Sequence, residues 1–535
     1  MSEDLKNNID PPINNKKNRL FIIIACAVPI LIYLQTLKFG LTYFDDNEII
    51  IDNKEFFSDF KNILQAFRKD AFIEETGYFY RPLQTISYMV DMHLSGENSV
   101  WMYHLSNTLL LGLIIVSLYL LLLRFLIPPK MALLSALIYC AHPLFVSSVA
   151  WIPARGDLLL TLFSLLSFLF FIEYLRENKI IYLFLNWIGF FIALFCKETA
   201  VILPVLFIIY YFSFSFSKRI ERKYLLIISL YLITVIFWFW IRSEAIGSFL
   251  NQNHEMLTSN QDDKVGVKVF QSNLRTLPES LASFLIPFGI DPLPGYSIIK
   301  TIIGLIIIVL IIAVFIRSVE RPRKEKIFCI SWFLLFSAPT MIFKNMTIDY
   351  LNHRFFLPLM GILLFVLFII PKRWFENGDF KRPWVLVAIL LFLSFFTFWN
   401  SRSYADPITF YNSAISKNPD SVVAYNNRGA VYHNQGLLDK AINDYTKAIE
   451  LKQDYAIAYK GRGNAYFKKR MYNDAIADYT KVIDLKEGDA DTFNNRGASY
   501  ANQGLYDKAC PDFVIAKKLG SRAAKVNLAK FCDID

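Results

Sequence analysis

Two adjacent carboxylates, Asp45 and Asp46, stand just beyond the first hydrophobic stretch of the chain, in the segment Tyr43-Phe44-Asp45-Asp46. Carboxylates this close to a membrane segment are costly unless they face water or a cation. One of them can act as a general base on an acceptor hydroxyl, while the other orients it or tunes its pKa. A solvated loop turn would give the same pair, so the pair alone leaves both interpretations open.

Other polar side chains lie at the ends of hydrophobic stretches. Polar groups in such places need water or a partner, so we expect them to mark a cavity at one face of the membrane. His104, His142, Arg155 and Asp157 are expected to be packing residues, with the last three holding the third and fourth spans together at that face. The segments that carry these groups are Tyr80-Arg81-Pro82-Leu83, Trp101–Asn107, His142-Pro143, Arg155-Gly156-Asp157, Lys197-Glu198-Thr199 and His353–Pro358.

Hydrophobic helices must position these groups. The chain has 535 residues, of which 55% are hydrophobic, more than a soluble enzyme of this length needs. Uncharged runs flanked by Arg or Lys are typical of membrane spans. The first run has no cleavage site after it, so we expect a retained signal anchor. About eleven spans are predicted, at 20–37, 103–123, 131–148, 157–175, 180–196, 199–216, 224–241, 297–316, 327–343, 355–370 and 383–400.

Loop charges predict the orientation of the spans. Basic residues gather in every second connection, and the positive-inside rule places those connections in the cytoplasm. The tail 1–19 is then cytoplasmic, and an odd number of spans puts residues 403–535 outside, in the periplasm, on the cell surface or in an ER-like lumen. Segment 279–290 is interpreted as a re-entrant or interfacial helix, because a span there would reverse the later loops against their charges. The net charge of +10 resides in such loops and does not indicate nucleic-acid binding.

A repeat of period 34 follows the last span. Tyr425-Asn426-Asn427-Arg428-Gly429 recurs as Tyr459–Gly463 and Phe493–Gly497, and later aromatic and alanine positions keep the same phase. The pattern resembles the tetratricopeptide repeat, a pair of antiparallel helices. The predicted fold is therefore all-α: a polytopic membrane bundle over 20–402, followed by an α-solenoid over 403–535. We expect a half repeat at 403–419, full repeats at 422–455, 456–489 and 490–523, and a C-terminal helix.

The solenoid predicts a groove that binds extended peptide. Asn427 and Asn495 fall on the first helix of their units, where groove-lining residues sit, although both could simply cap or solvate those helices. A half repeat directly after the last span suggests that the arm stacks on that span without a linker. Cys510 and Cys532 are 22 residues apart, and in an oxidising compartment a disulfide between them would clamp the terminal helix. The other four cysteines are interpreted as small core residues.

The motifs in this order resemble the transmembrane-and-TPR-containing protein O-mannosyltransferases and their bacterial relatives, which have the multi-spanning C-type glycosyltransferase (GT-C) fold. The resemblance implies a polyprenyl- or dolichyl-phosphate sugar donor, with mannose as the sugar, and a Ser or Thr hydroxyl of an acceptor protein. It makes Asp45 or Asp46 the base. The leaving phosphate needs cations, for which Arg354 and Lys197 come first, then His353 and Arg81. Arg354 could instead snorkel, and Lys197 could pair with Glu198.

No Cys/His cluster indicates a zinc site. The resemblance implies that a divalent ion, where one is used, is held by Asp-x-Asp, but Asp45 and Asp46 are adjacent and no second acidic cluster is obvious, so metal-independent chemistry is favoured. Two other functions remain open. A C-type transferase could act on a lipid or glycan while the repeats assemble partners. A non-enzymatic membrane scaffold would also carry repeats, but it does not explain the polar groups at the span ends.

Overall fold

The structure is a computed structural model that describes residues 16–71, 73, 79–97, 99–214, 222–258, 273–342, 352–371, 374–376 and 379–532. The chain divides into two compact units, Met1–Asp406 and Pro407–Asp535. Helices dominate both units, and the described strands are the two-residue β1 (Phe375–Glu376) and β2 (Asp379–Phe380), which pair antiparallel. The predicted class, an all-α membrane bundle followed by a helical solenoid, is confirmed.

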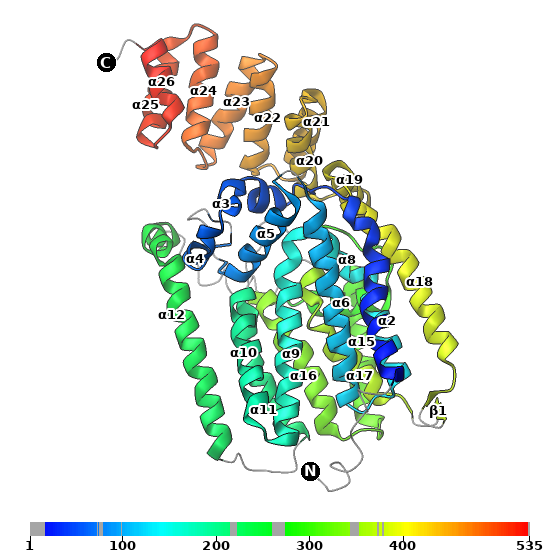
Figure 1. Cartoon of the computed structure of the whole chain (residues 1–535). Coiled ribbons are helices and arrows are strands. Elements are labelled where there is room, and N and C mark those ends of the chain that lie inside the picture. Colours follow the sequence, from blue (N-terminus) through cyan, green and yellow to red (C-terminus); the bar gives the residue numbers. More distant parts are fainter. Residues whose placement is uncertain are drawn as a thin grey trace. The chain divides into compact units, whose positions relative to one another are not determined.

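The long helices of the first unit run side by side (Figure 1). Six segments of the described chain are long and apolar enough to cross a membrane, so this is a multi-pass membrane protein. They are Asn18–Lys38, Trp101–Arg124, Ile152–Glu177, Leu225–Ile246, Ile298–Arg317 and Pro383–Tyr404, which correspond to α2 (Lys16–Tyr33) with η1 (Leu34–Lys38), α6 (Trp101–Arg124), η5 (Ile152–Ala154) with α9 (Arg155–Glu177), α12 (Arg222–Thr258), α15 (Ile298–Arg317) and α18 (Pro383–Ser401) with η9 (Arg402–Tyr404).

Shorter helices complete the bundle. A seventh span results if α7 (Pro129–Cys140) is joined to η4 (Pro143–Phe145) and α8 (Val146–Ala150), which are bent by 53°. Each of the eleven predicted segments overlaps a helix, but the count of eleven remains a prediction. The remaining helices are α10 (Ile180–Cys196), η6 (Glu198–Ile202), α11 (Leu203–Phe214), α14 (Thr276–Leu285), α16 (Arg323–Ile342), η7 (Asn352–Phe355) and α17 (Leu359–Ile369).

Helix α14 covers residues 279–285 of the segment 279–290. Whether that segment spans the membrane decides on which side the later loops are predicted to lie. The ten residues of α14 extend about 15 Å, half of the hydrocarbon thickness of a bilayer. It packs closely on α15, and the absence of a Cβ at Gly304 allows this approach, since a Cβ there would lie 1.9 Å from the carbonyl oxygen of Pro278. These features agree with a non-spanning helix.

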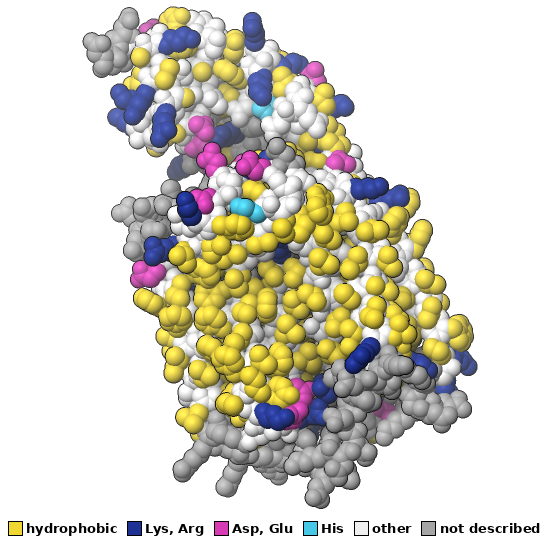
Figure 2. Space-filling view, in the orientation of Figure 1, with side chains coloured by type: hydrophobic (Ala, Val, Ile, Leu, Met, Phe, Trp, Pro, Cys, Tyr) yellow, Lys and Arg dark blue, Asp and Glu magenta, His cyan; other side chains and the backbone are white. Residues whose placement is uncertain are grey.

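Hydrophobic side chains cover the face of the first unit seen in Figure 2. The helices α12, α15 and α18 are among those that carry exposed apolar side chains, including Ile236, Val309 and Phe395. Such a surface is stable against lipid tails rather than water.

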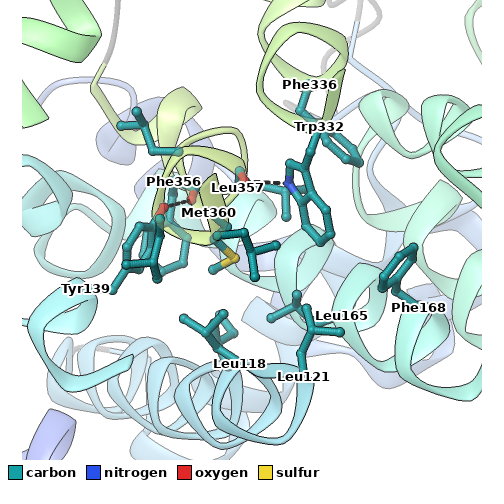
Figure 3. Packing of buried hydrophobic residues seen from close by; sticks show 14 of the residues in the cluster. Leu118, Leu121, Tyr139, Leu165, Phe168, Trp332, Phe336, Phe356, Leu357 and Met360 are labelled. Atoms are coloured by element: carbon teal, nitrogen blue, oxygen red, sulfur yellow. Dashed lines mark hydrogen bonds between the residues drawn. The ribbon is translucent and has the colours of Figure 1, made fainter. Parts of the chain in front are cut away.

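The interior beneath α17 is filled by large apolar side chains from several helices: Leu118 and Leu121, Tyr139, Leu165 and Phe168, Trp332 and Phe336, and Met360 (Figure 3). Two polar atoms in this core bond to the chain just before α17. The Tyr139 hydroxyl donates to the carbonyl of Phe356, and the Trp332 indole N–H donates to that of Leu357 over 3.0 Å. The core therefore fixes the segment that carries His353 and Arg354.

A short helical subdomain lies between α2 and α6. It contains η2 (Asn47–Ile51), α3 (Lys54–Ser58), η3 (Phe60–Asn62), α4 (Ile63–Ala66) and α5 (Pro82–Ser95). These elements bury a separate cluster that includes Ile49, Phe57, Tyr88 and Met89. This second small core holds the first long loop in a defined shape.

The second unit consists of paired helices, α19 (Pro407–Lys417), α20 (Val422–Asn434), α21 (Leu438–Leu451), α22 (Ala456–Lys468), α23 (Tyr472–Asp484), α24 (Ala490–Asn502), α25 (Tyr506–Lys518) and α26 (Arg522–Phe531). The repeated glycine allows the two helices of a unit to approach. A Cβ at Gly463 would lie 2.9 Å from the ring of Tyr479, and Gly497 meets Phe513 at the same distance. The spacing of 34 residues thus reflects one recurring contact.

The repeated arginine forms a second recurring contact. Arg462 donates to both carboxylate oxygens of Asp478, over 2.8 and 2.9 Å, and also to the hydroxyl of Thr446 in the preceding unit, over 3.0 Å. Arg428 and Arg496 repeat the arrangement with the residues sixteen positions before and after them, Asn412 with Asp444 and Thr480 with Asp512. Each guanidinium therefore connects three helices.

A disulfide joins Cys510 on α25 to Cys532 at the end of α26, with the Cα atoms 5.7 Å apart. This is the pair that the sequence suggests. Cys140, Cys196 and Cys329 are buried as free thiols in the first unit.

Replacing Arg462 with Met should destabilise the repeat unit by about 2 kcal/mol, because Asp478, which is 5% exposed, loses its bidentate partner. Lys447→Met is the matched control, since the Lys447–Glu450 pair is exposed and should contribute less than about 0.5 kcal/mol. Urea unfolding of residues 403–535, followed by circular dichroism, measures both. Equal midpoints for the two variants would contradict the prediction.

Candidate active site

A cavity of about 250 Å³ opens in the first unit, among the start of α5, α9, η6, α16 and η7. Its lining has two characters. One part is charged, with Arg81, Asp157, Lys197, Glu198 and Arg354. The other is apolar and consists of Phe79, Leu160, Val201, Ile202, Phe336, Pro339, Leu357 and Pro358, with Thr199 and Thr340 between. Such a cavity suits a ligand with an anionic head and an apolar body.

Lys197 and Asp157 form the central pair. The Lys197 ammonium donates to both carboxylate oxygens of Asp157, over 2.6 and 2.7 Å. His353 Nε2 lies 3.7 Å from the same carboxylate. Lys197 thus pairs with a residue forty positions away in the sequence, whereas the alternative considered from sequence was its neighbour Glu198.

Glu198 holds a different cation. Its carboxylate lies 3.5 Å from Nε of Arg81 and accepts a 2.8 Å hydrogen bond from the backbone N–H of Tyr80. The Arg81 guanidinium also stacks over the ring of Phe79, 4.5 Å from its centroid. Both contacts hold Arg81 at the cavity wall.

Arg354 differs from these two cations. It lines the cavity, but among the residues that the structure describes it forms no ion pair or hydrogen bond. Asp157, Asp45 and Glu198 lie within electrostatic reach of its guanidinium. A partly buried guanidinium with five N–H donors and no direct carboxylate partner in the described part of the chain is suited to an incoming anion.

The structure distinguishes the two adjacent carboxylates. Asp46 is 1% exposed and is held by its own loop, accepting hydrogen bonds from the backbone N–H and hydroxyl of Thr42, over 2.7 and 3.0 Å, and from the N–H of Phe44, over 3.1 Å. Asp45 is partly exposed and adopts a left-handed backbone conformation with φ 66°. Asp46 therefore shapes the loop, and Asp45 is the carboxylate that remains accessible.

Both carboxyl groups have raised pKa values. Burial, followed by the nearby charges of Glu48 and Asp46, raises the pKa of Asp45 to about 7, while Arg354 and Arg81 act in the opposite direction. Burial raises the pKa of Asp46 to about 6, opposed by its hydrogen bonds from Thr42 and Phe44. Asp45 therefore has the pKa of a base that works near neutral pH.

Arg155 contacts other helices than the third and fourth predicted spans, which the sequence analysis expected it to join. It is fully buried and pairs with Asp91 of α5 over 2.5 Å. It also donates to the Asn107 side chain and the Tyr103 carbonyl of α6, each over 2.7 Å. It thus fixes α5 and α6 to the start of α9.

The other two histidines that the sequence analysis singled out, His104 and His142, are buried. His142 accepts from the backbone N–H of Leu144, and its Nε2 lies 2.9 Å from the carbonyl of Phe284, so it contacts α14 rather than α9. His104 lies at the start of α6 and packs edge-on against Phe39. Neither residue lines the cavity.

In the second unit, several side-chain amides form hydrogen bonds with one another. Asn495 Nδ2 donates to Asn464 Oδ1 over 3.2 Å, and Tyr479 donates to the same oxygen over 2.7 Å. Asn427 accepts from its neighbour Asn426 over 2.9 Å. Asn495 is therefore engaged in contacts between helices, which adds a structural role to the groove-lining role expected from sequence.

One residue of this region escaped the sequence analysis. Trp151 donates its indole N–H to the carbonyl of Phe44 over 2.8 Å, next to Asp45. It stands between Ala150 and the segment that begins at Arg155, and a tryptophan near a membrane surface is usually interpreted as an interfacial anchor. No residue spacing in this single sequence distinguishes an interfacial anchor from a tryptophan that binds the Phe44 loop.

Among the described residues, no group of three or more His, Cys, Asp or Glu side chains is arranged to hold a metal ion.

Comparison with known proteins confirms the resemblance suggested by the motif order. Residues 87–240 match the family described as dolichyl-phosphate-mannose-protein mannosyltransferase, and residues 422–455 and 456–489 match the tetratricopeptide repeat. Human protein O-mannosyl-transferase TMTC4 is 30% identical over 161 residues, which is 25% of this chain and 21% of the relative. The Tmtc2 protein of Drosophila melanogaster is 27% identical over 191 residues, covering 34% and 20%, and mouse TMTC3 is 27% identical over 196 residues, covering 35% and 20%.

The chain thus spans about a fifth of the length of the curated relatives it matches. Among solved structures, the crystal structure of YrrB, a TPR protein with an unusual peptide-binding site, is 28% identical and covers 21% of this chain and 57% of its own, with a TM-score of 0.20.

Proposed function

We propose that this protein is a membrane glycosyltransferase that moves a sugar from a polyprenyl- or dolichyl-phosphate donor to Ser or Thr of an acceptor protein. One observation supports this above all others: Arg354, without a direct partner among the described residues, faces a cavity that is charged on one side and apolar on the other. A lipid-phosphate sugar has the same division between a charged head and an apolar chain. The similar mannosyltransferases suggest mannose as the sugar.

The reaction is a displacement at the anomeric carbon. Asp45 removes the proton from the acceptor hydroxyl, the hydroxyl oxygen forms a bond to the anomeric carbon, and the bond from that carbon to the phosphate oxygen breaks. The lipid phosphate leaves with the electron pair. One displacement inverts the configuration.

Charge develops on the phosphate oxygen as its bond to the sugar breaks. Arg354 is the principal donor to that oxygen, because among the described residues no carboxylate forms an ion pair with it. Lys197 and Arg81 keep the cavity positive while bound to Asp157 and Glu198. His353 stays close to the Asp157 carboxylate and supports the pair.

The sidedness of the reaction follows from the loop charges. Cytoplasmic basic loops put the N-terminus inside and the Asp45 loop and repeats outside. A disulfide between Cys510 and Cys532 agrees with an extracytoplasmic repeat unit, where thiols are oxidised. In this proposal the repeats bind the acceptor polypeptide.

Asp45→Asn tests the base directly. We expect transfer of mannose from polyprenyl-phosphate mannose to a Ser/Thr-rich peptide to fall by about 10²–10⁴-fold, because an amide cannot accept the hydroxyl proton. Asp52→Asn, on the same loop and exposed, is the matched control and should keep full activity. Asp46→Asn, by contrast, should lower the unfolding temperature, since the NH₂ group of the new asparagine would face the backbone N–H donors of Thr42 and Phe44. Full activity of Asp45→Asn would refute the proposal.

The pH dependence of transfer should report Asp45. The base works deprotonated, and its pKa is about 7, so the rate should rise with pH and level off above about pH 8. Below about pH 6, kcat/KM should fall about tenfold per pH unit, as the protonated fraction approaches one. A rate that stays constant from pH 5 to 8 would exclude a base with this pKa.

Arg354→Met should weaken use of the donor. Loss of charge-assisted hydrogen bonds to a phosphate is expected to cost about 10–100-fold in kcat/KM for the lipid-phosphate sugar, with the KM for the acceptor peptide unchanged. Arg402→Met, which removes an exposed guanidinium that stacks on Phe398 and Trp399, serves as the control. A value of kcat/KM for the donor equal to that of the control would assign phosphate binding elsewhere.

A further inference from the structure

Trp151 connects the two halves of the candidate active site. Its indole N–H donates to the carbonyl of Phe44 over 2.8 Å, and its ring lies 5.4 Å from the Phe44 ring. The same ring lies 5.0 Å from the imidazole of His353. One side chain therefore contacts the carboxylate loop and the segment that carries Arg354.

The carboxylate loop needs such a support. Tyr43 and Asp45 both have positive φ angles, 55° and 66°, although neither is glycine. A left-handed conformation costs about 1–2 kcal/mol for each such residue, so the surroundings must hold it. The Asp46 carboxylate holds the loop from within, through Thr42 and the N–H of Phe44. Trp151 holds it from outside, at the carbonyl of that same Phe44.

Trp151 is itself rigidly placed. It is 5% exposed and links α8 to η5, two short elements whose residues are buried throughout. Its carbonyl accepts from the N–H of Ala154 over 3.2 Å, one residue before the fully buried Arg155. Through Arg155 this segment is tied to α5 and α6.

The segment on the other side is equally fixed. Asn352 Nδ2 donates to the carbonyl of Asp291 over 3.1 Å, and His353 Nε2 lies 3.7 Å from Asp157. The carbonyls of Phe356 and Leu357 accept from Tyr139 and Trp332. Arg354 stands between these anchors, so a side chain that contacts both His353 and the Asp45 loop sets the distance between the base and the cation.

We propose that Trp151 is a positioning residue that holds the Asp45 carboxylate in register with the Arg354 side of the cavity. This inference rests on the proposed function, in which Asp45 is the base and Arg354 binds the donor phosphate. Neither Trp151 nor Asp45 is among the residues that line the cavity. Trp151 acts through its hydrogen bond to the loop that carries Asp45.

The N–H and the ring of Trp151 have separable roles. Phenylalanine keeps an aromatic ring between Phe44 and His353 but has no donor for the Phe44 carbonyl. The loop then loses its outer support while its own Asp46 hydrogen bonds remain. We expect Asp45 to move by a fraction of an ångström to about 1 Å, a displacement that can cost 10²-fold in rate.

The test compares Trp151→Phe with Trp187→Phe, in sugar transfer from polyprenyl-phosphate mannose to a Ser/Thr-rich peptide. The control also loses one indole hydrogen bond, from Trp187 to the Thr234 hydroxyl over 3.0 Å, between α10 and α12 and away from the cavity lining. Rates are normalised to folded protein by thermal unfolding in detergent. We expect Trp151→Phe to lower kcat about 10–100-fold with the donor KM within about twofold of that of the control.

The pH profile adds a readout that a loss of packing would not change. A looser loop admits water to Asp45, so its pKa should move from about 7 towards the ordinary carboxyl range, and the acid limb of the rate profile should move to lower pH. Activity and pH profile equal to those of Trp187→Phe would overturn the inference. So would a loss fully explained by less folded protein or by a raised donor KM.

Asp45→Asn, measured in parallel, separates this inference from the proposed function. If Asp45→Asn is inactive and Trp151→Phe matches its control, the base assignment stands and the positioning role fails. If Asp45→Asn retains full activity, the proposed function fails first, and the positioning role fails with it.

Discussion

The need to pair buried charges organises the extracytoplasmic side proposed for this bundle. A charge removed from water is stable only with a partner of opposite sign and good geometry. Arg155 with Asp91, Lys197 with Asp157 and Arg81 with Glu198 meet that need by linking segments that are distant in sequence. Each pair fixes the end of a helix, and together they leave the cavity with one guanidinium, Arg354, that forms no such pair with a described residue. The same rule that stabilises the fold therefore leaves a cation where we propose that the donor phosphate binds.

The strained carboxylate loop depends on that frame. Left-handed φ angles at Tyr43 and Asp45 persist only where contacts with neighbouring groups stabilise this backbone conformation by more than the strain costs. The neighbours here are the hydrogen bonds of Asp46 and the indole of Trp151, and Trp151 leads directly into the segment anchored by Arg155. Strain and a raised carboxyl pKa at one residue are both costs to stability, and their coincidence at Asp45 is typical of a site selected for chemistry.

The sequence predicted the elements better than the contacts between them. Helical, all-apolar runs are visible in composition alone, and a 34-residue period predicts paired helices because each repeat makes the same contact between Gly and an aromatic ring. The cations near the cavity were found because polar groups at the ends of hydrophobic stretches need water or a partner, and because the family resemblance implies a phosphate that needs cations. Their partners were not. Lys197 and Glu198 are adjacent in the chain, yet the backbone of Lys197 is extended where α10 ends and η6 begins, and their side chains meet different helices. Which partner each one meets depends on helix packing, which no local pattern encodes.

A similar limit applies to Asp45 and Asp46. Their chemistry is identical, and only the backbone geometry around them decides which carboxylate caps the loop and which stays open. The arginine ladder of the repeats shows the opposite case. Arg428, Arg462 and Arg496 each meet an Asp sixteen residues later, and that fixed spacing is present in the sequence. Interactions that recur with the fold's own period can be predicted from one sequence, whereas an active site occurs once and combines segments with no common period. Its geometry must come from the structure.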